Sequence, residues 1–211
     1  MAVPIDLVKK LREMSGAPMM ECKKALEEAG GDLEQAFTVL RKRGQAAAAK
    51  KASRAATEGL VGSYIHAGGK IGVIVEVNCE SDFVARNTEF QQLVHDLAMQ
   101  ICATDPRFIR RDDVAPDVLD REREVLRAQT AGSGKPADVV NRIVEGKLGK
   151  FYEENCLYEQ HFIKDGTGNV TVGELIASRV AKFGENILVR RFSRFKVGEA
   201  AGPADADEAS N

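Results

Sequence analysis

The stretch "IGVIVEVNCESDFVARN", residues 71–87, contains the change of pattern that decides the fold. Its first eight residues are rich in Val and Ile, which is typical of a buried strand. The polar residues that follow indicate a turn towards solvent, and Asn87 is a suitable N-cap for a helix. Because Gly72 and Ile74 are apolar on the face opposite Val73 and Val75, we expect this strand to be covered on both faces.

The segments on either side extend this pattern. Upstream, "LVGSYI" at residues 60–65 predicts a second strand, and Gly68 and Gly69 supply the backbone freedom of a tight hairpin turn. Downstream of Asn87, apolar residues recur at helical spacing up to Cys102 and predict a helix that lies across the sheet. The stripe consists of Phe90, Leu93, Val94, Leu97, Ala98, Ile101 and Cys102.

Residues 5–44 predict three short helices. The second opens at Pro18 and stops at the pair Gly30–Gly31, and Asp32 can cap the third. Helices of this length bury little apolar surface each, so we expect them to pack as a small bundle. Residues 1–55 are thus expected to form a three-helix bundle and a basic helical linker.

The linker, "RKRGQAAAAKKASR" at residues 41–54, has six positive charges and no acid. Its alanines favour a helix with almost no core to bury, which indicates an exposed spacer. A nucleic-acid-binding segment is the alternative, although no aromatic side chains are interleaved for base stacking.

The second half predicts helices over residues 116–130 and 137–152, a strand at "EQHFI", residues 159–163, and a capping box from Thr171 to Glu174. The last predicted strand, residues 186–197, has no cleanly apolar face, which favours a sheet edge or a subunit contact. Together these segments predict an α+β protein: an N-terminal bundle, a helical linker, then a mainly antiparallel sheet covered by helices. We expect an α+β core over residues 56–198 and an acidic, disordered tail over residues 199–211.

Composition excludes several kinds of protein. The formal net charge of the 211 residues is −2, so any basic surface that attracts nucleic acid must be local. No segment is apolar over the roughly 18 residues that a membrane helix needs, and we expect a cytoplasmic protein, or one of a matrix-like compartment after loss of a targeting peptide. Four dispersed cysteines indicate reduced thiols and not a zinc site.

No motif for catalysis emerges. "AGSGKP", residues 131–136, lacks the first Gly and the final Ser or Thr of a phosphate-binding loop. The three histidines are dispersed and have no recognisable nucleophile beside them. We therefore expect no active site, cofactor or metal of the chain's own.

The polar turn itself has two interpretations. Phe83 and Val84 can form one turn that anchors the strand to the next helix, with Cys79 as a small core residue. Alternatively, Phe83 protrudes as a hydrophobic wedge, with Asp82 beside it, aimed at another protein. The sequence pattern does not choose between them.

Longer motifs resemble a known family. "LREMSGAPMMECKKALEEAGGDLEQAFTVLRKRG", residues 11–44, closely resembles the N-terminal module of translation elongation factor Ts. "VNCESDFVARN" resembles that family's signature, which usually has Thr where this chain has Ser81. "TVGELIA" and "RFKVG" continue the similarity, which covers nearly all of residues 1–198.

The resemblance implies a guanine-nucleotide exchange factor for elongation factor Tu, and not an enzyme acting on a substrate. It implies that the bundle is ubiquitin-associated-like and docks on the partner's GTPase domain. The signature would enter near the partner's nucleotide and Mg²⁺ site, with Asp82 and Phe83 central and Ser81 and Val84 beside them. GDP would then leave and GTP could bind.

Further contacts are expected elsewhere on the chain. A second contact is expected around Arg12, Met19 and Met20 of the bundle, although the two methionines can equally belong to its core. His66 lies in a stretch that resembles a family hairpin facing the partner. A ubiquitin-binding adaptor is the alternative function that the bundle leaves open.

The chain resembles the short form of the family, with one sheet subdomain and no coiled-coil insertion. Short members associate in pairs, so the resemblance implies a homodimer and a 2:2 complex with elongation factor Tu, without direct contact to nucleic acid or membrane. Some short members resemble this chain but carry a cysteine near the position of Ser193. A serine there cannot link two chains covalently.

Overall fold

The N-terminal helices form the expected bundle. The computed structural model describes residues 3–130, 136–166 and 168–199 and begins with α1 (Ile5–Ser15), α2 (Met19–Glu28) and α3 (Leu33–Lys51). The Asp32 carboxylate caps α3 by accepting a hydrogen bond of 2.8 Å from the Gln35 amide. The side chains that the three helices bury together are Val8, Leu11, Cys22, Ala25, Leu26 and Ala36.

The basic stretch continues α3 to Lys51 and is helical as predicted, but it is exposed on one side only. Its other side packs on α8 (Val172–Phe183) and buries Gly44. Ala48 contacts the main core as well. Small side chains let two helices approach closely, and this is the contact that the expectation of an exposed spacer missed.

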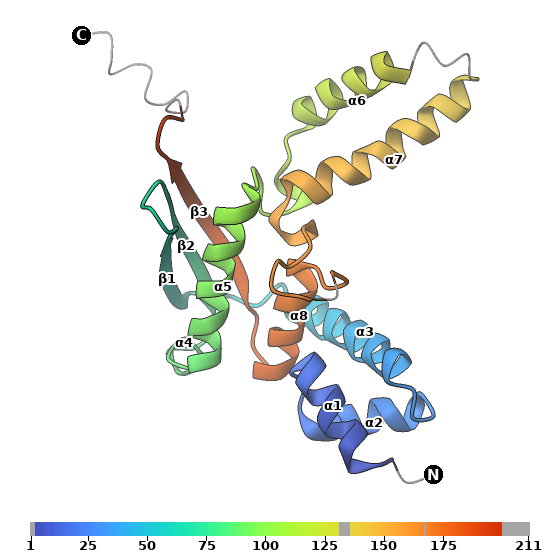
Figure 1. Ribbon diagram of the computed structural model, residues 1–211, viewed down its shortest axis with the longest axis vertical. Helices are drawn as coiled ribbons and strands as arrows, with labels where there is room; N and C mark the ends of the chain where they lie inside the picture. The colour runs from blue at the N-terminus through green and yellow to red at the C-terminus, as the bar shows by residue number, and fades with distance from the viewer. Residues whose placement is uncertain (1–2, 131–135, 167, 200–211) are drawn as a thin grey trace.

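A three-stranded antiparallel sheet follows, in the order β1 (Glu58–Ile65), β2 (Ile71–Cys79), β3 (Leu188–Lys196) (Figure 1). The β1–β2 hairpin turns through Gly68 and Gly69, whose φ angles of 91° and 68° are those that glycine adopts readily. Asn87 caps α5 (Thr88–Thr104), and all seven residues of the predicted stripe are buried. The predictions of this hairpin and of this helix are confirmed.

Helix α5 lies across one face of the sheet (Figure 1). The core between them contains Val73, Val75 and Val77 of β2, and α8 closes it with Ile176 and Val180. The approach is close enough that a Cβ on Gly62 of β1 would lie 2.4 Å from Cγ1 of Val94. Glycine at this position therefore sets how near α5 sits to the sheet.

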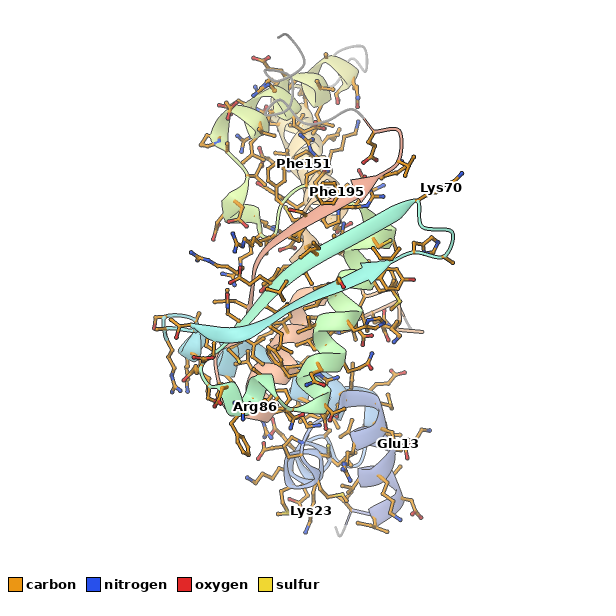
Figure 2. The ribbon with its side chains drawn as sticks, turned by 90° about the vertical axis from the view of Figure 1, so that its left-hand side faces the viewer. Glu13, Lys23, Lys70, Arg86, Phe151 and Phe195 are labelled. Atoms are coloured by element: carbon orange, nitrogen blue, oxygen red, sulfur yellow. The ribbon has the colours of Figure 1, made fainter. Side chains whose placement is uncertain are left out.

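The opposite face of the sheet is uncovered in the single chain, contrary to the expectation for residues 71–78. Ile74 is 50% exposed, and no helix lies over the strands where the sheet faces the viewer in Figure 2. The apolar side chains exposed on this side are Val61, Ile65, Ile74, Phe195 and Val197. Gly72 is partly shielded only by Ile65, whose Cδ1 atom would lie 2.9 Å from a Cβ at that position.

A β-bulge explains why the last strand has no apolar face. Val77 pairs with Val189 but the preceding Glu76 pairs with Arg191, so one residue of β3 is left over. An extra residue reverses which side chains point inward. Val189 is buried before the bulge, and Phe192 packs against the core after it. The strand lies at a sheet edge, as predicted.

Two long helices form an arm that the sequence did not predict as a unit. Helices α6 (Pro116–Thr130) and α7 (Ala137–Asn155) pack side by side and extend away from the sheet (Figure 1). Leu126 packs with Val144 and Leu148, while Leu119 reaches Tyr152, so the pair is antiparallel. Each helix offers an apolar stripe that the other helps to cover.

Residues 159–163 are not a strand. They follow a short 3-10 helix, Leu157–Glu159, and form a single bridge between His161 and Thr171. Thr171 and Glu174 form the predicted capping box at the start of α8, which ends at Gly184. All four cysteines are free and buried, as expected for reduced thiols. The predicted "AGSGKP" loop falls mainly, and the acidic tail almost entirely, outside the described residues.

Candidate partner-binding site

The signature residues form one turn of helix at the end of β2. Helix α4 comprises Asp82–Ala85, and the Ser81 hydroxyl caps it by accepting a hydrogen bond of 3.4 Å from the Val84 amide. Asn87 then starts α5, so only two residues separate the two helices. A threonine could form the same cap, because the hydroxyl is the part that both residues share.

Phe83 and Val84 differ sharply in exposure, although one interpretation of this turn took both of them as the anchor. Val84 is 7% exposed and Ala85 5%, and both belong to the main core. Phe83, between Asp82 and Val84, is 83% exposed. Val84 is therefore the anchor, and Phe83 is an aromatic ring that projects into solvent beside it.

A carboxylate from the far end of the chain holds this turn. Glu185 lies just after α8 and accepts three hydrogen bonds: from the Glu80 amide at 3.1 Å, the Ser81 amide at 3.0 Å and the Ser81 hydroxyl at 2.6 Å. Three donors on one carboxylate, two of them backbone groups, fix both its position and that of the donors. The turn therefore has little freedom to reorient.

The neighbouring Asn186 ties a third segment to the same place. Its backbone amide donates to the Glu80 carboxylate at 2.6 Å. Its side-chain amide donates to the Arg54 carbonyl at 2.8 Å and to the Ala52 carbonyl at 3.4 Å. Arg54 also forms an ion pair with Glu80 at 3.6 Å. The end of the N-terminal segment, the end of β2 and the start of β3 thus meet at one junction.

The chemistry around the turn is not that of a reactive centre. Burial, together with the charge of Glu185, raises the pKa of the Cys79 thiol to about 11, so the thiol stays protonated at neutral pH. It donates to the Ser81 carbonyl at 3.1 Å. Asp82 pairs with Arg86 at 2.9 Å, and both side chains are largely exposed. The site presents a ring and a charge pair, and no activated nucleophile.

The bundle residues named from the resemblance lie on the surface. Met20 is 60% exposed and Met19 36%, and Arg12 is exposed, so neither methionine belongs to the bundle core. In Figure 2, Arg86 at the signature turn and Lys23 on α2 lie towards the same end of the molecule. These two labelled residues share the lower half of the molecule, while Figure 1 separates α4 from α2 across its width.

His66 lies at the other end of the hairpin, in the same turn as Lys70, which Figure 2 labels. The nine residues of β2 span eight steps of about 3.3 Å, so the two ends of the strand lie roughly 26 Å apart. His66 is exposed, and its Nδ1 atom lies 3.4 Å from the Tyr64 hydroxyl. Any contact that His66 makes with a partner is thus separate from that of Phe83.

The basic stretch is partly neutralised. Arg41 pairs with Glu174, Arg43 with Glu28 and Glu21, and Arg54 with Glu80. These pairs remove three cations from the surface proposed for nucleic acid. Within the ranges that the structure describes, no three His, Cys, Asp or Glu residues are grouped to hold a metal ion, and no helix is long and apolar enough to cross a membrane.

Glu185 and Asn186 are the residues of this site that the sequence did not reveal. They follow the helix stop at Gly184 in the ordinary stretch "GENIL", and their partners lie more than 100 residues away. No local pattern marks a carboxylate that closes a contact over such a separation.

Comparison with known proteins identifies relatives over nearly the whole chain. The family model "Elongation factor TS" matches residues 23–199. The chain is 60% identical to "Elongation factor Ts" of Koribacter versatilis, an alignment that covers 97% of this chain and 92% of the relative. It is 56% identical to the same-named protein of Solibacter usitatus, with coverages of 98% and 96%. That of Geobacter sulfurreducens is 52% identical, with coverages of 100% and 96%.

Proposed function

Because the chain belongs to the elongation factor Ts family of translation elongation factors, we propose that it is a guanine-nucleotide exchange factor that releases GDP from elongation factor Tu. The observation that carries this proposal is the exposed Phe83 on a turn that is otherwise fixed. A ring held in solvent by a rigid support loses little conformational entropy when a partner buries it.

In this proposal the signature turn enters the partner beside its nucleotide. Phe83 wedges between partner side chains, with Asp82 next to it, and Ser81 and Val84 hold the turn in shape. The insertion displaces the elements that hold Mg²⁺ against the phosphates. Because Mg²⁺ neutralises phosphate charge, its loss raises the free energy of the bound nucleotide and GDP leaves.

The coupling is reciprocal. The factor binds nucleotide-free elongation factor Tu more tightly than the GDP complex, so GDP weakens binding of the factor by the same ratio. GTP binding then displaces the factor. No bond is made or broken in this cycle, so the protein is not an enzyme in the chemical sense.

Phe83 alone cannot supply the free energy. Burying one Phe side chain contributes about 1.5–3 kcal/mol, or between one and two decades in an equilibrium constant. The bundle provides the second contact through Arg12, Met19 and Met20, whose exposure supports this assignment. The hairpin at His66 is a third, separate contact.

The rate of GDP release tests the function directly. Elongation factor Tu loaded with a fluorescent GDP is mixed with excess unlabelled GDP, with and without this protein, and the loss of fluorescence is followed. We expect a strong acceleration that saturates with concentration, and an unchanged rate would refute the proposal. Met20→Asp is expected to raise the concentration needed for half-saturation while leaving thermal unfolding unchanged, because Met20 is 60% exposed.

We also propose that two chains associate through the uncovered face of the sheet and form a 2:2 complex with elongation factor Tu. A row across the three strands, Ile65, Gly72 and Phe195, is paired in register. Over Gly72 lies a hollow of about 360 Å³ lined by Ile65, Ile74, Phe195 and Val197. Apolar side chains around a hollow on a strand face are suited to interdigitate with a second copy.

The polar residues of the same face fit this arrangement. Glu76 and Arg191 pair at 2.6 Å beside the apolar row, and the Arg191 guanidinium holds the pKa of the Glu76 carboxyl below its usual value. Ser193 lies on β3 next to the row and is exposed. Its hydroxyl is compatible with a contact between copies that has no covalent link.

Light scattering tests the dimer. We expect the mass of two chains for the wild type and of one chain for Phe195→Asp, because a buried unpaired charge opposes the contact. Val125→Asp is the matched control, since Val125 is 51% exposed but lies on α6. A wild-type monomer at all concentrations would contradict the proposal.

A further inference from the structure

We propose that Glu185 is the positioning residue for Phe83, and that with Asn186 it fixes the signature turn relative to the end of the N-terminal segment. The effect on nucleotide exchange rests on the function proposed above, whereas the effect on the turn itself can be measured without a partner.

The turn is too short to hold its own shape. Helix α4 has four residues, and helices of this length are unstable in water because nucleation costs more than one turn of hydrogen bonds returns. Val84 and Ala85 are buried on one side, whereas Asp82 and Phe83 are exposed. The direction in which Phe83 projects therefore depends on the cap at Ser81.

Glu185 determines how that cap works. A hydroxyl has one proton, and Ser81 donates it to the Glu185 carboxylate at 2.6 Å. This leaves the oxygen lone pairs free to accept from the Val84 amide. The same carboxylate holds the amides of Glu80 and Ser81, so the last backbone groups before α4 are fixed together with the hydroxyl.

The junction also connects the turn to the bundle. Asn186 is 4% exposed and bonds to the carbonyls of Ala52 and Arg54, just after α3 ends at Lys51. Arg54 returns to Glu80, which accepts from the Asn186 amide. Together these contacts fix the position of α4 relative to the end of α3. Two contacts that are fixed relative to each other bind one partner without an additional ordering cost.

A double-mutant cycle on Glu185 and Ser81 tests the assignment. Glu185→Ala, Ser81→Ala and the double variant are compared by amide hydrogen exchange at Val84, Ala85 and Arg86 in the free protein. We expect exchange at these amides to rise about tenfold in each single variant, since a hydrogen bond to a charged group is worth about that factor. The double variant should rise by less than the two single effects combined, because both changes remove the hydrogen bond between Glu185 and the Ser81 hydroxyl.

The maximal rate of GDP release is measured on the same variants. We expect a loss of about tenfold at saturating concentration for both single variants, with half-saturation changed less, because the bundle contact remains. Ser81→Thr keeps the hydroxyl and should behave as the wild type. Glu159→Ala is the matched control, since Glu159 also accepts from a charged partner, Arg111, at 2.6 Å but lies near the arm.

The outcomes separate the two proposals. If Glu185→Ala shows the wild-type rate of amide hydrogen exchange at α4, the positioning role is overturned, whatever the rate of GDP release. So would additive effects in the double variant. If Glu185→Ala proves unfolded, Glu185→Gln, which keeps one acceptor oxygen for the two amides, must still raise exchange at α4, and wild-type protection in that variant would overturn the assignment. If the wild type itself fails to release GDP, the proposed function fails while the turn measurements still decide the role of Glu185.

Discussion

Replacement of Phe83 by alanine separates a role in binding from a role in folding. The side chain is 83% exposed, so its removal takes almost nothing from the core and the melting temperature should stay within about 1 °C of the wild type. If the partner buries the ring, the variant loses about 1.5–3 kcal/mol of interaction, which is a factor of roughly ten to a hundred. We expect that factor in the saturating rate of GDP release.

The assay is stopped-flow release of fluorescent GDP from elongation factor Tu over a range of factor concentrations. Half-saturation should change much less than the maximal rate, because the variant leaves the contact proposed for Met19, Met20 and Arg12 intact. Val125→Ala, a truncation of a 51% exposed side chain on α6, serves as the control and should leave both quantities unchanged. An undiminished maximal rate in Phe83→Ala, or a loss of activity matched by a large fall in melting temperature, would refute the wedge.

Four further predictions concern stability. Val84→Ala should lower the free energy of unfolding by about 2 kcal/mol, because Val84 is 7% exposed in the main core, and chemical denaturation measures this loss. Gly44→Ala should raise the free energy of unfolding by about 0.5–1 kcal/mol, and with it the melting temperature, because alanine favours a helix over glycine. A Cβ there stays 3.6 Å from its nearest neighbour and therefore fits. Gly62→Ala should lower the melting temperature, because its Cβ would lie 2.4 Å from the Val94 side chain, and the opposite order of the two variants would contradict this. The Cys79 pKa is raised from 9.0 to about 11, so the native state keeps a proton that the unfolded chain loses first. The unfolding free energy should therefore fall as pH rises through this window, and less so in Cys79→Ala; denaturation at three pH values checks the slope.

The elements that could be predicted from the sequence are those whose cause is local. The hairpin of β1 and β2 depends on Gly68 and Gly69, and α8 depends on a capping box within four residues. The exposed Phe83 was one of two open interpretations, because exposure depends on what packs over a residue and not on its neighbours in sequence. Its role came from a resemblance and not from the pattern.

The elements that could not be predicted depend on contacts between distant residues or on one extra residue in a strand. The bulge in β3 reverses its inward face, which no alternation pattern reveals. Helix α3 is partly covered because α8, more than 100 residues later, presents a close surface to Gly44. The hydrogen bonds of Glu185 with Ser81 span a similar separation and left no trace in either local sequence.

The arm of α6 and α7 has apolar clusters of its own, around Leu126 and Phe151, that are separate from the cluster under the sheet. Its length is therefore free to change during evolution without redesign of the rest of the protein. Insertion of one heptad in each helix, in step, would preserve the shared stripe and lengthen the reach by about 10 Å. Relatives of different length can thus differ in span while they keep the same sheet and the same signature turn.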